Sequence, residues 1–286
     1  MVEIKPLPEP AGKIMAGFMA KILKIEPPFV DGVYITGSLA LNDFHRNKSD
    51  VDFIVICKTL PDKSVSNRLE RIHAAISKQF DKPDLNGCYI ASDCISTDRP
   101  TQISALSYHA GKLRYGHFEM APVTLWELKY HAITLFGEKA ENLHIGMIRA
   151  DLHAFLHENI NGYWKKWLHQ HAAWFRKRLL LLLFPRFTEW SILGVARQIY
   201  TLHTGRIASK TEAGLYCLDR LPLKFQSVVK QALEIRKDHR RYPIVKSYAI
   251  RPSFQRLKQT LDCLHYMISV FNQAYKVQEN KSASQS

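Results

Sequence analysis

Apolar and polar residues alternate with two different periods in this chain, and the change between them falls near the middle. Before residue 120, short runs of apolar and β-branched residues predict strands, the clearest at 33–35, 51–57 and 84–90. Residues 100–118 predict a loop and a hairpin with its turn at 109–112. From residue 147 onward, apolar residues recur every three or four positions, as in amphipathic helices. The pattern predicts an α+β N-terminal domain followed by an all-α domain.

Helices are also expected among the strands of the first domain. One covers residues 10–24, a second follows Pro61-Asp62, and a third begins at Pro122 and ends with Gly137 as its C-cap. His73 lies beside the apolar stripe of the second helix and is interpreted as a packed surface histidine.

The second domain is expected to consist of helices joined by short loops. Residues 151–184 predict one long helix or two, and residues 226–241 and 253–276 predict two more. The helix at 226–241 ends in a basic run, Arg236 to Arg241, which is interpreted as exposed.

Length and charge support a division into two domains. The chain has 286 residues, and the boundary is placed near 140–150, which gives domains at 1–145 and 146–276. The polar residues 277–286 are expected to form a disordered tail. Residues 1–145 hold 17 basic and 17 acidic residues, whereas residues 146–286 hold 23 and 9, the whole net charge of +14. A basic second half is suited to an anionic partner, such as nucleotide phosphates.

Cysteine spacing and hydropathy indicate the cellular compartment. The five cysteines lack CxxC spacing, which indicates reduced thiols and neither disulfides nor a zinc site. The longest apolar run, Leu179 to Phe184, is far too short to span a membrane. The first ten residues contain acids and prolines and do not resemble a signal peptide. A cytoplasmic location without a membrane partner is therefore expected.

The stretch from Gly32 to Lys58 carries the clearest chemical signal. It reads as a strand, a turn at Gly37-Ser38, a short helix, a loop and a second strand. Asp50 and Asp52 are two residues apart at the start of the second strand, so they are predicted to share a face. Two adjacent carboxylates repel unless a cation joins them, and Mg²⁺ prefers carboxylate oxygens together with substrate phosphates. The alternative is two surface acids beside a structural turn.

This motif resembles the signature of the polymerase-beta-type nucleotidyltransferases. Gly37-Ser38, eleven further residues and then Asp50-Val51-Asp52 carry the resemblance, within two hydrophobic strands. The resemblance implies an α+β nucleotidyltransferase domain with a small mixed sheet and helices. It also implies that Asp50 and Asp52 are catalytic and hold one or two Mg²⁺ ions, and that Gly37, Ser38 and Ser49 bind nucleotide phosphates.

A third carboxylate is expected on the next strand, because enzymes of this type use one there to assist the metal or accept a proton. Asn86 occupies the matching position, and an amide cannot accept a proton at neutral pH. Asp84 lies two residues earlier on the same face and is the nearest catalytic substitute. Asp93 and Glu119 are weaker alternatives.

Residues 190–214 resemble the C-terminal helical domain of the streptomycin/spectinomycin (aminoglycoside) adenylyltransferases. In both, a helix containing an arginine leads to a tyrosine, then to Thr204-Gly205 and to Lys210. With residues 218–222 and the first motif, the resemblance spans most of 30–240. It implies a helical-bundle domain in which Lys210 binds the phosphates of ATP, the co-substrate. A solvent-exposed lysine at the start of a helix is the alternative.

The residues expected to hold an antibiotic differ from those of that family. Its aminoglycoside-binding members place acids and a tryptophan before the arginine-containing helix. Here residues 180–190 contain Glu189 as their one acid, together with Arg186 of opposite charge. A cationic antibiotic would be held weakly in so basic a domain. The resemblance therefore favours nucleotide chemistry and leaves the acceptor open.

Together these features predict a Mg²⁺-dependent nucleotidyltransferase that moves AMP from ATP to a hydroxyl of a small molecule, with aminoglycosides as candidate acceptors. Two alternatives stay open. One is a modifier of RNA or protein of the toxin–antitoxin type, suggested by the spacing of Arg197 and His203. The other is a non-catalytic nucleotide-binding protein, suggested by Asn86.

Overall fold

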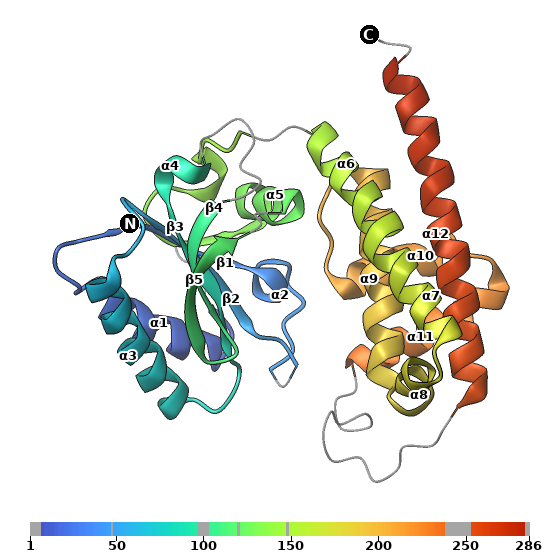
Figure 1. The fold of residues 1–286 in the computed structure, drawn as a ribbon, viewed down its shortest axis with the longest axis horizontal. Helices are drawn as coiled ribbons and strands as arrows, with labels where there is room; N and C mark the ends of the chain where they lie inside the picture. The colour runs from blue at the N-terminus through green and yellow to red at the C-terminus, as the bar shows by residue number, and fades with distance from the viewer. Residues whose placement is uncertain are drawn as a thin grey trace. The chain divides into compact units, whose positions relative to one another are not determined.

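The computed structural model describes residues 7–46, 48–95, 103–118, 121–146, 149–237 and 253–283. Within-chain contacts divide the chain into two compact units, Met1–Ile148 and Arg149–Ser286. The first unit contains a six-stranded sheet with helices, and the second is built from helices over its described residues (Figure 1). The predicted fold class, an α+β domain followed by an all-α domain, is confirmed.

The sheet of the first unit is mixed. Its strands run in the order β5-β4-β3-β2-β1-β6, and only β2 and β3 are parallel to each other. Parallel neighbours need a long crossover connection, which α3 supplies here. The strands are β1 (Val30–Thr36), β2 (Val51–Cys57), β3 (Leu85–Ala91), β4 (Ile103–His109), β5 (Lys112–Phe118) and β6 (Ile133–Phe136).

Helices cover both faces of this sheet. Successive strand residues point to opposite faces, so Val33 and Ile35 of β1 join the core beneath α1 and α3. Tyr34 of β1 points to the other face, where Leu125 and Leu128 of α5 pack against it. Figure 1 shows α1 and α3 side by side on one face. The helical segments are α1 (Ala11–Ile22), α2 (Gly37–Ala40), α3 (Lys63–Gln79), α4 (Ser92–Ile95), α5 (Pro122–His131) and the 3₁₀ turn η1 (Ala140–Asn142).

His73 of α3 is buried, so the prediction that it lies at the surface was wrong. Its side chain is 1% exposed and its ring stacks on Tyr108 with centroids 3.7 Å apart. Its Nε2 shares a hydrogen bond of 2.8 Å with the hydroxyl of Tyr89. His73 follows Leu69 by four residues, which places it on the same helix face toward the sheet.

The segment that follows α5 is a strand, which corrects the predicted helix up to Gly137. The helix ends at His131, and β6 pairs with the outer edge of β1 through Ile133, Thr134 and Phe136. Gly137 has a φ of +86° and turns the chain after β6. Apolar residues in this short strand continue the helical spacing of α5, so periodicity alone did not separate the two elements.

The second unit is helical where the sequence predicted helices. Residues 151–184 were expected to form one long helix or two, and they form two: a continuous helical stretch from Arg149 to Ala173 that includes a π-helical segment, and a second helix from Phe175 to Leu183. The backbone is extended at Trp174 between them and again at Phe184. The helices of this unit are α6 (Arg149–Glu158), the π-helical η2 (Asn159–Trp164), α7 (Lys165–Ala173), α8 (Phe175–Leu183), α9 (Pro185–Thr204), α10 (Lys210–Leu218), α11 (Leu223–Lys237) and α12 (Phe254–Ala283).

The last helix continues beyond its predicted end. Helix α12 runs to Ala283, so the predicted disordered tail at 277–286 is wrong for 277–283, and residues 284–286 lie outside the described part. The side chain of Gln278 donates a hydrogen bond of 2.9 Å to the carbonyl of Leu202, which ties this end of α12 to α9.

Helix α9 is the centre of the second unit, and α10, α11 and α12 pack around it. Glycine at position 194 of α9 lets the ring of Trp164 approach the helix, because a Cβ on residue 194 would lie 2.5 Å from that ring.

No described helix is long and apolar enough to cross a membrane alone. Helices α8 and α9 reach that length and hydropathy only as a pair, and they are bent by 96° relative to each other.

Candidate active site

Gly37 lies at the point where β1 turns into α2. Its φ is +66°, a left-handed conformation that residues with a Cβ rarely adopt. A Cβ at this position would lie 2.0 Å from Oδ2 of Asp52. Only glycine therefore permits this turn together with a carboxylate packed directly against it.

Asp50, Asp52 and Asn86 lie on one face of the sheet. Asp52 of β2 is in register with Asn86 of β3, and register partners in a sheet point to the same face. The amide Nδ2 of Asn86 donates a hydrogen bond of 2.8 Å to Oδ2 of Asp50, which brings that carboxylate to the same face. The structure thus gathers two carboxylates beside the turn at Gly37.

The surroundings of Asp50 disfavour its charged form. Burial raises the pKa of this carboxyl, and the neighbouring charge of Asp84 raises it further. The hydrogen bond from Asn86 and the charge of Lys82 act in the opposite direction on the same pKa. A cation bound beside Asp50 would offset the repulsion from the neighbouring carboxylates and favour the charged form of Asp50.

Of the three acids considered in place of Asn86, Asp84 lies near the candidate metal carboxylates, because its charge acts on Asp50. Asp84 is about half exposed and is ion-paired with Lys82. Asp93 lies exposed on α4, and Glu119 is outside the described residues. The Oδ1 of Asn86 accepts a hydrogen bond of 3.4 Å from the amide of Ala110.

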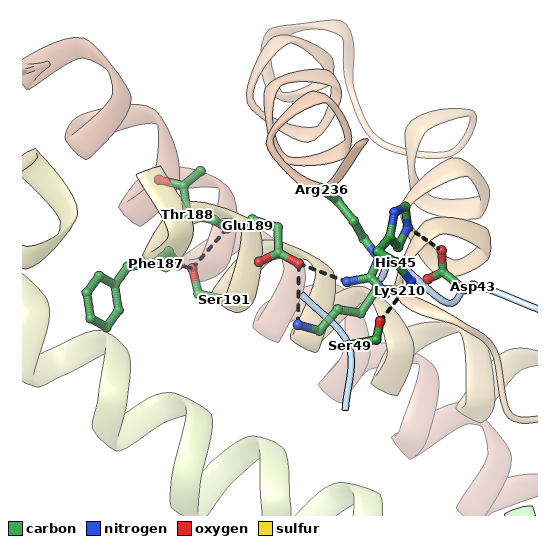
Figure 2. Close-up of polar contacts among 9 residues, drawn as sticks. All are labelled: Asp43, His45, Ser49, Phe187, Thr188, Glu189, Ser191, Lys210 and Arg236. Atoms are coloured by element: carbon green, nitrogen blue, oxygen red, sulfur yellow. Dashed lines mark hydrogen bonds and ion pairs between the residues drawn. The ribbon is translucent and has the colours of Figure 1, made fainter. Parts of the chain in front are cut away.

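The two predicted phosphate-binding serines differ in their contacts. The Oγ of Ser38 is buried and, among the described residues, has no hydrogen-bond partner. Such an atom costs about 1–3 kcal/mol unless a ligand or water satisfies it. The Oγ of Ser49 accepts a hydrogen bond of 3.0 Å from the amide of His45, and the His45 ring is in turn 3.1 Å from Asp43 (Figure 2).

Glu127 is a carboxylate at this site that the sequence did not indicate. It lies on α5, is 9% exposed, and its Oε1 accepts a hydrogen bond from the amide of Gly37. Ninety residues separate the two partners, so no local pattern connects them. The sequence signal that could have pointed to Glu127 is its position between Leu125 and Leu128, on the buried face of a predicted helix.

Lys210 belongs to a buried ionic cluster in the second unit. Figure 2 shows the carboxylate of Glu189 joined to Lys210 at 3.3 Å and to Arg236 at 3.4 Å. Burial lowers the pKa of Lys210, and Arg236 and Arg197 lower it further, while Glu189 opposes them. In the printed ion pairs of the described residues, one carboxylate, Glu189, faces two cations, Lys210 and Arg236.

Arg236 differs from what the sequence suggested. Arg236 was expected in an exposed basic run, yet it is 7% exposed because Glu189 of α9 pairs with it; residues 238–241 of that run lie outside the described part. Arg197 and His203 contact their own unit: Arg197 Nε donates to the carbonyl of Ala208, and His203 shares a hydrogen bond with the hydroxyl of Tyr216.

The carboxylates beside Gly37 suit a hard divalent ion that also binds substrate phosphates. Asp50 and Asp52 supply two carboxylate groups, and Mg²⁺ commonly takes one or two from a protein and completes its shell with phosphate and water oxygens. Among the described residues, there is no group of three or more histidine, cysteine, aspartate or glutamate side chains that could hold a metal.

Comparison with known proteins identifies both units. Residues 19–91 match the family described as the nucleotidyltransferase domain, and residues 185–251 match the C-terminal domain of the aminoglycoside adenylyltransferases. The chain resembles the aminoglycoside adenylyltransferases over both units, and it is an enzyme of the nucleotidyltransferase class. No curated protein matches the sequence of this nucleotidyltransferase.

A solved structure shares the fold of this nucleotidyltransferase. The spectinomycin adenyltransferase AAD(9) from Enterococcus faecialis, crystallised with ATP and spectinomycin, superposes with a TM-score of 0.63. The match covers 91% of this chain and 98% of that protein, at 15% sequence identity. At such an identity the likeness establishes the fold, and the chemistry has to be argued from the residues of this chain.

Proposed function

We propose that this nucleotidyltransferase transfers AMP from ATP to a hydroxyl of a small molecule in a Mg²⁺-dependent reaction. The observation that carries the proposal is the position of Asp52, whose carboxylate packs against Gly37 while Asp50 lies on the same face. Together these residues offer carboxylates for the metal and a glycine turn for the phosphates. Both domains of the chain match families of nucleotidyl-transferring enzymes.

Each residue of the first unit has a distinct role in this proposal. Asp50 and Asp52 hold Mg²⁺, which when bound neutralises phosphate charge and favours ionisation of the attacking hydroxyl. Gly37, Ser38 and Ser49 bind the β- and γ-phosphates, and the buried hydroxyl of Ser38 gains the partner it lacks among the described residues. We assign proton acceptance to Asp84, acting from beside Asp50, because Asn86 cannot accept a proton.

The second unit contributes a cation to the nucleotide. Lys210 is held in a cluster with excess positive charge, and a lysine ammonium is a suitable point charge for a polyphosphate. When the phosphates arrive, they offer Lys210 additional negative charge beyond that of Glu189. ATP is the proposed nucleotide because the second unit matches an adenylyltransferase domain.

The acceptor is proposed to be a small molecule with a free hydroxyl. Spectinomycin is the first compound to test, because the enzyme of similar fold was crystallised with it. Glu189, the one acid in the segment where that family holds its drug, is already paired with Lys210 and Arg236. A strongly cationic aminoglycoside therefore lacks its usual counter-charge here and is a weaker candidate than a nearly neutral acceptor.

The test is pyrophosphate release from each nucleoside triphosphate with Mg²⁺, across a panel that begins with spectinomycin and streptomycin. Asp52→Asn should lower the turnover number by at least about 10³-fold, because it removes a metal carboxylate. Asp62→Asn, at an exposed helix cap of the same unit, is the matched control and should retain activity. Undiminished activity of Asp52→Asn would refute the proposal.

Asn86 supports one alternative, a nucleotide-binding protein without catalytic activity. The amide stands in register with Asp52 and donates to Asp50, so no proton acceptor occupies that position. Under this alternative, ATP with Mg²⁺ binds, but no acceptor in the panel is modified. Asn86→Glu would then leave the protein inactive, whereas a weak transferase should become faster.

A further inference from the structure

The Glu127 carboxylate occupies the hydrogen-bond donor that the proposed function assigns to a nucleotide phosphate. Its Oε1 accepts from the amide of Gly37, and its helix is fixed by Leu125 and Leu128, both buried in the core on this face of the sheet. A carboxylate oxygen and a phosphate oxygen are alike to an amide donor, since both are anionic acceptors. Glu127 therefore already occupies this donor with a carboxyl oxygen in the structure.

The strand order places Glu127 on the phosphate side of the site. Asn86 is on β3, Asp52 is on β2, and Gly37 follows β1, so the three lie on successive strands. Glu127 contacts the β1 end, across Asp52 from Asn86. It is therefore poorly placed to replace the missing third carboxylate at Asn86.

Glu127 and a phosphate cannot both bind Gly37 at full strength. A backbone amide donates one hydrogen bond, and a second acceptor on the same proton weakens both bonds. The carboxylate of Asp52 also packs against Gly37, so a phosphate entering beside both acids meets repulsion unless one withdraws. Asp52 is needed for the metal, which leaves Glu127 as the group that moves.

We propose that Glu127 is a positioning residue that holds the Gly37 amide in the nucleotide-free enzyme. The triphosphate must displace Glu127 from this amide, so Glu127 makes the affinity for ATP lower than it would be without the carboxylate. This inference rests on the proposed function, because it takes the Gly37 amide as a phosphate site. It makes Glu127 an internal competitor of the substrate.

Calorimetric titration with ATP in the presence of Mg²⁺ tests this inference. Glu127→Gln keeps the shape of the side chain but replaces a charged acceptor by a neutral one, so it should bind ATP about tenfold more tightly than the wild type. Glu127→Ala should change the affinity in the same direction. Glu70→Gln removes the same charge from an exposed position on α3 and should not change the affinity. Adenosine has no phosphates, so its affinity should not respond to Glu127→Gln.

The outcomes separate this inference from the function beneath it. If the wild type binds ATP and the Glu127→Gln variant binds it equally well or more weakly, the role of Glu127 is overturned. The proposed function is left intact by that result. Failure of both proteins to bind any nucleotide overturns both. A crystal of the wild-type ATP complex gives a second readout that needs no variant. There the Glu127 carboxylate should lie beyond about 3.5 Å from the Gly37 nitrogen, and a retained hydrogen bond contradicts the inference.

Discussion

At the scale of single residues, Gly37 determines whether the candidate site can form. Its backbone has a φ of +66°, its amide donates to Glu127, and its missing side chain makes room for Asp52. Three separate requirements thus meet at one glycine. The turn, the carboxylate proposed to hold the metal and the amide proposed to bind phosphate are coupled through this position.

Gly37→Ala should therefore abolish turnover and also destabilise the first unit. The left-handed conformation costs an alanine about 1–2 kcal/mol, and the new Cβ displaces the carboxylate of Asp52. Gly111→Ala is the matched control, because Gly111 also has a positive φ, +75°, but open space around it. Denaturant unfolding should show a loss in both variants, while pyrophosphate release should fail only in Gly37→Ala. Equal activity in both would contradict the role assigned to Gly37.

His73 predicts how the stability of the first unit depends on pH. Burial lowers the pKa of its ring from 6.5 to about 3, and the side chains packed on it are the aromatic rings of Phe18, Phe53, Tyr89 and Tyr108. Below about pH 6.5 the unfolded chain binds a proton that the folded protein does not, so the free energy of unfolding should fall by about 1.4 kcal/mol per pH unit down to about pH 3.

The measurement is denaturant unfolding of the wild type and His73→Gln between pH 7 and pH 4. Glutamine cannot be protonated, so the free energy of unfolding of the variant should depend less steeply on pH. Identical slopes for the two proteins would show that the His73 ring does not govern this dependence.

The residues of the motif could be predicted because their spacing in sequence reports on the local backbone. Gly37, Ser38, Asp50 and Asp52 fall within sixteen residues, between the end of β1 and the start of the adjacent strand β2. The contacts of Glu127 with Gly37 and of Arg236 with Glu189 join residues that are 90 and 47 positions apart. Such pairs depend on how elements pack, which no local pattern describes.

At the scale of elements, helices and strands with a long apolar pattern were predictable, whereas the four-residue strand β6 was not. Strand β2 at Val51–Cys57 and helix α1 at Ala11–Ile22 follow directly from their apolar patterns. Strand β6 has only four residues and exists because the outer edge of β1 needs a hydrogen-bonding partner. The break at Phe184 has a local cause, because Pro185 disfavours helical geometry in the residue before it.

Helix packing in the second unit predicts opposite effects for two glycines. Gly194→Ala should lower the free energy of unfolding by about 1–3 kcal/mol, because its Cβ would meet the Trp164 ring at 2.5 Å in the core. Gly162→Ala has open space around it and should be neutral or stabilising by up to about 1 kcal/mol. Thermal or denaturant unfolding measures both, and equal stability of the two variants would contradict this packing.

At the scale of the whole molecule, the two units differ in charge. The carboxylates proposed to hold the metal lie in the first unit, whereas the ionic cluster of Lys210, Arg236 and Glu189 lies in the second. The net charge of +14 arises entirely from residues 146–286. The proposed function assigns the metal to acids of the first unit and a phosphate contact to Lys210 of the second, so it predicts that substituting these residues in either unit lowers the affinity for ATP.

Lys210→Ala should weaken ATP binding by about 10–100-fold although Asp50 and Asp52 are intact. The expected loss is that of one charged hydrogen bond to a phosphate, about 1.5–3 kcal/mol. Lys165→Ala removes an equal charge from an exposed site of the same unit and is the control. Calorimetric titration measures both dissociation constants, and an unchanged value for Lys210→Ala would remove the second unit from the nucleotide site.

The most direct test of the central claim is the anomalous scattering of Mn²⁺ in a crystal grown with ATP and this ion in place of Mg²⁺. The account predicts a peak about 2.0–2.3 Å from carboxylate oxygens of Asp50 and Asp52, with the triphosphate against Gly37 and Ser38. A nucleotide bound elsewhere, or a metal that contacts neither aspartate, would contradict it.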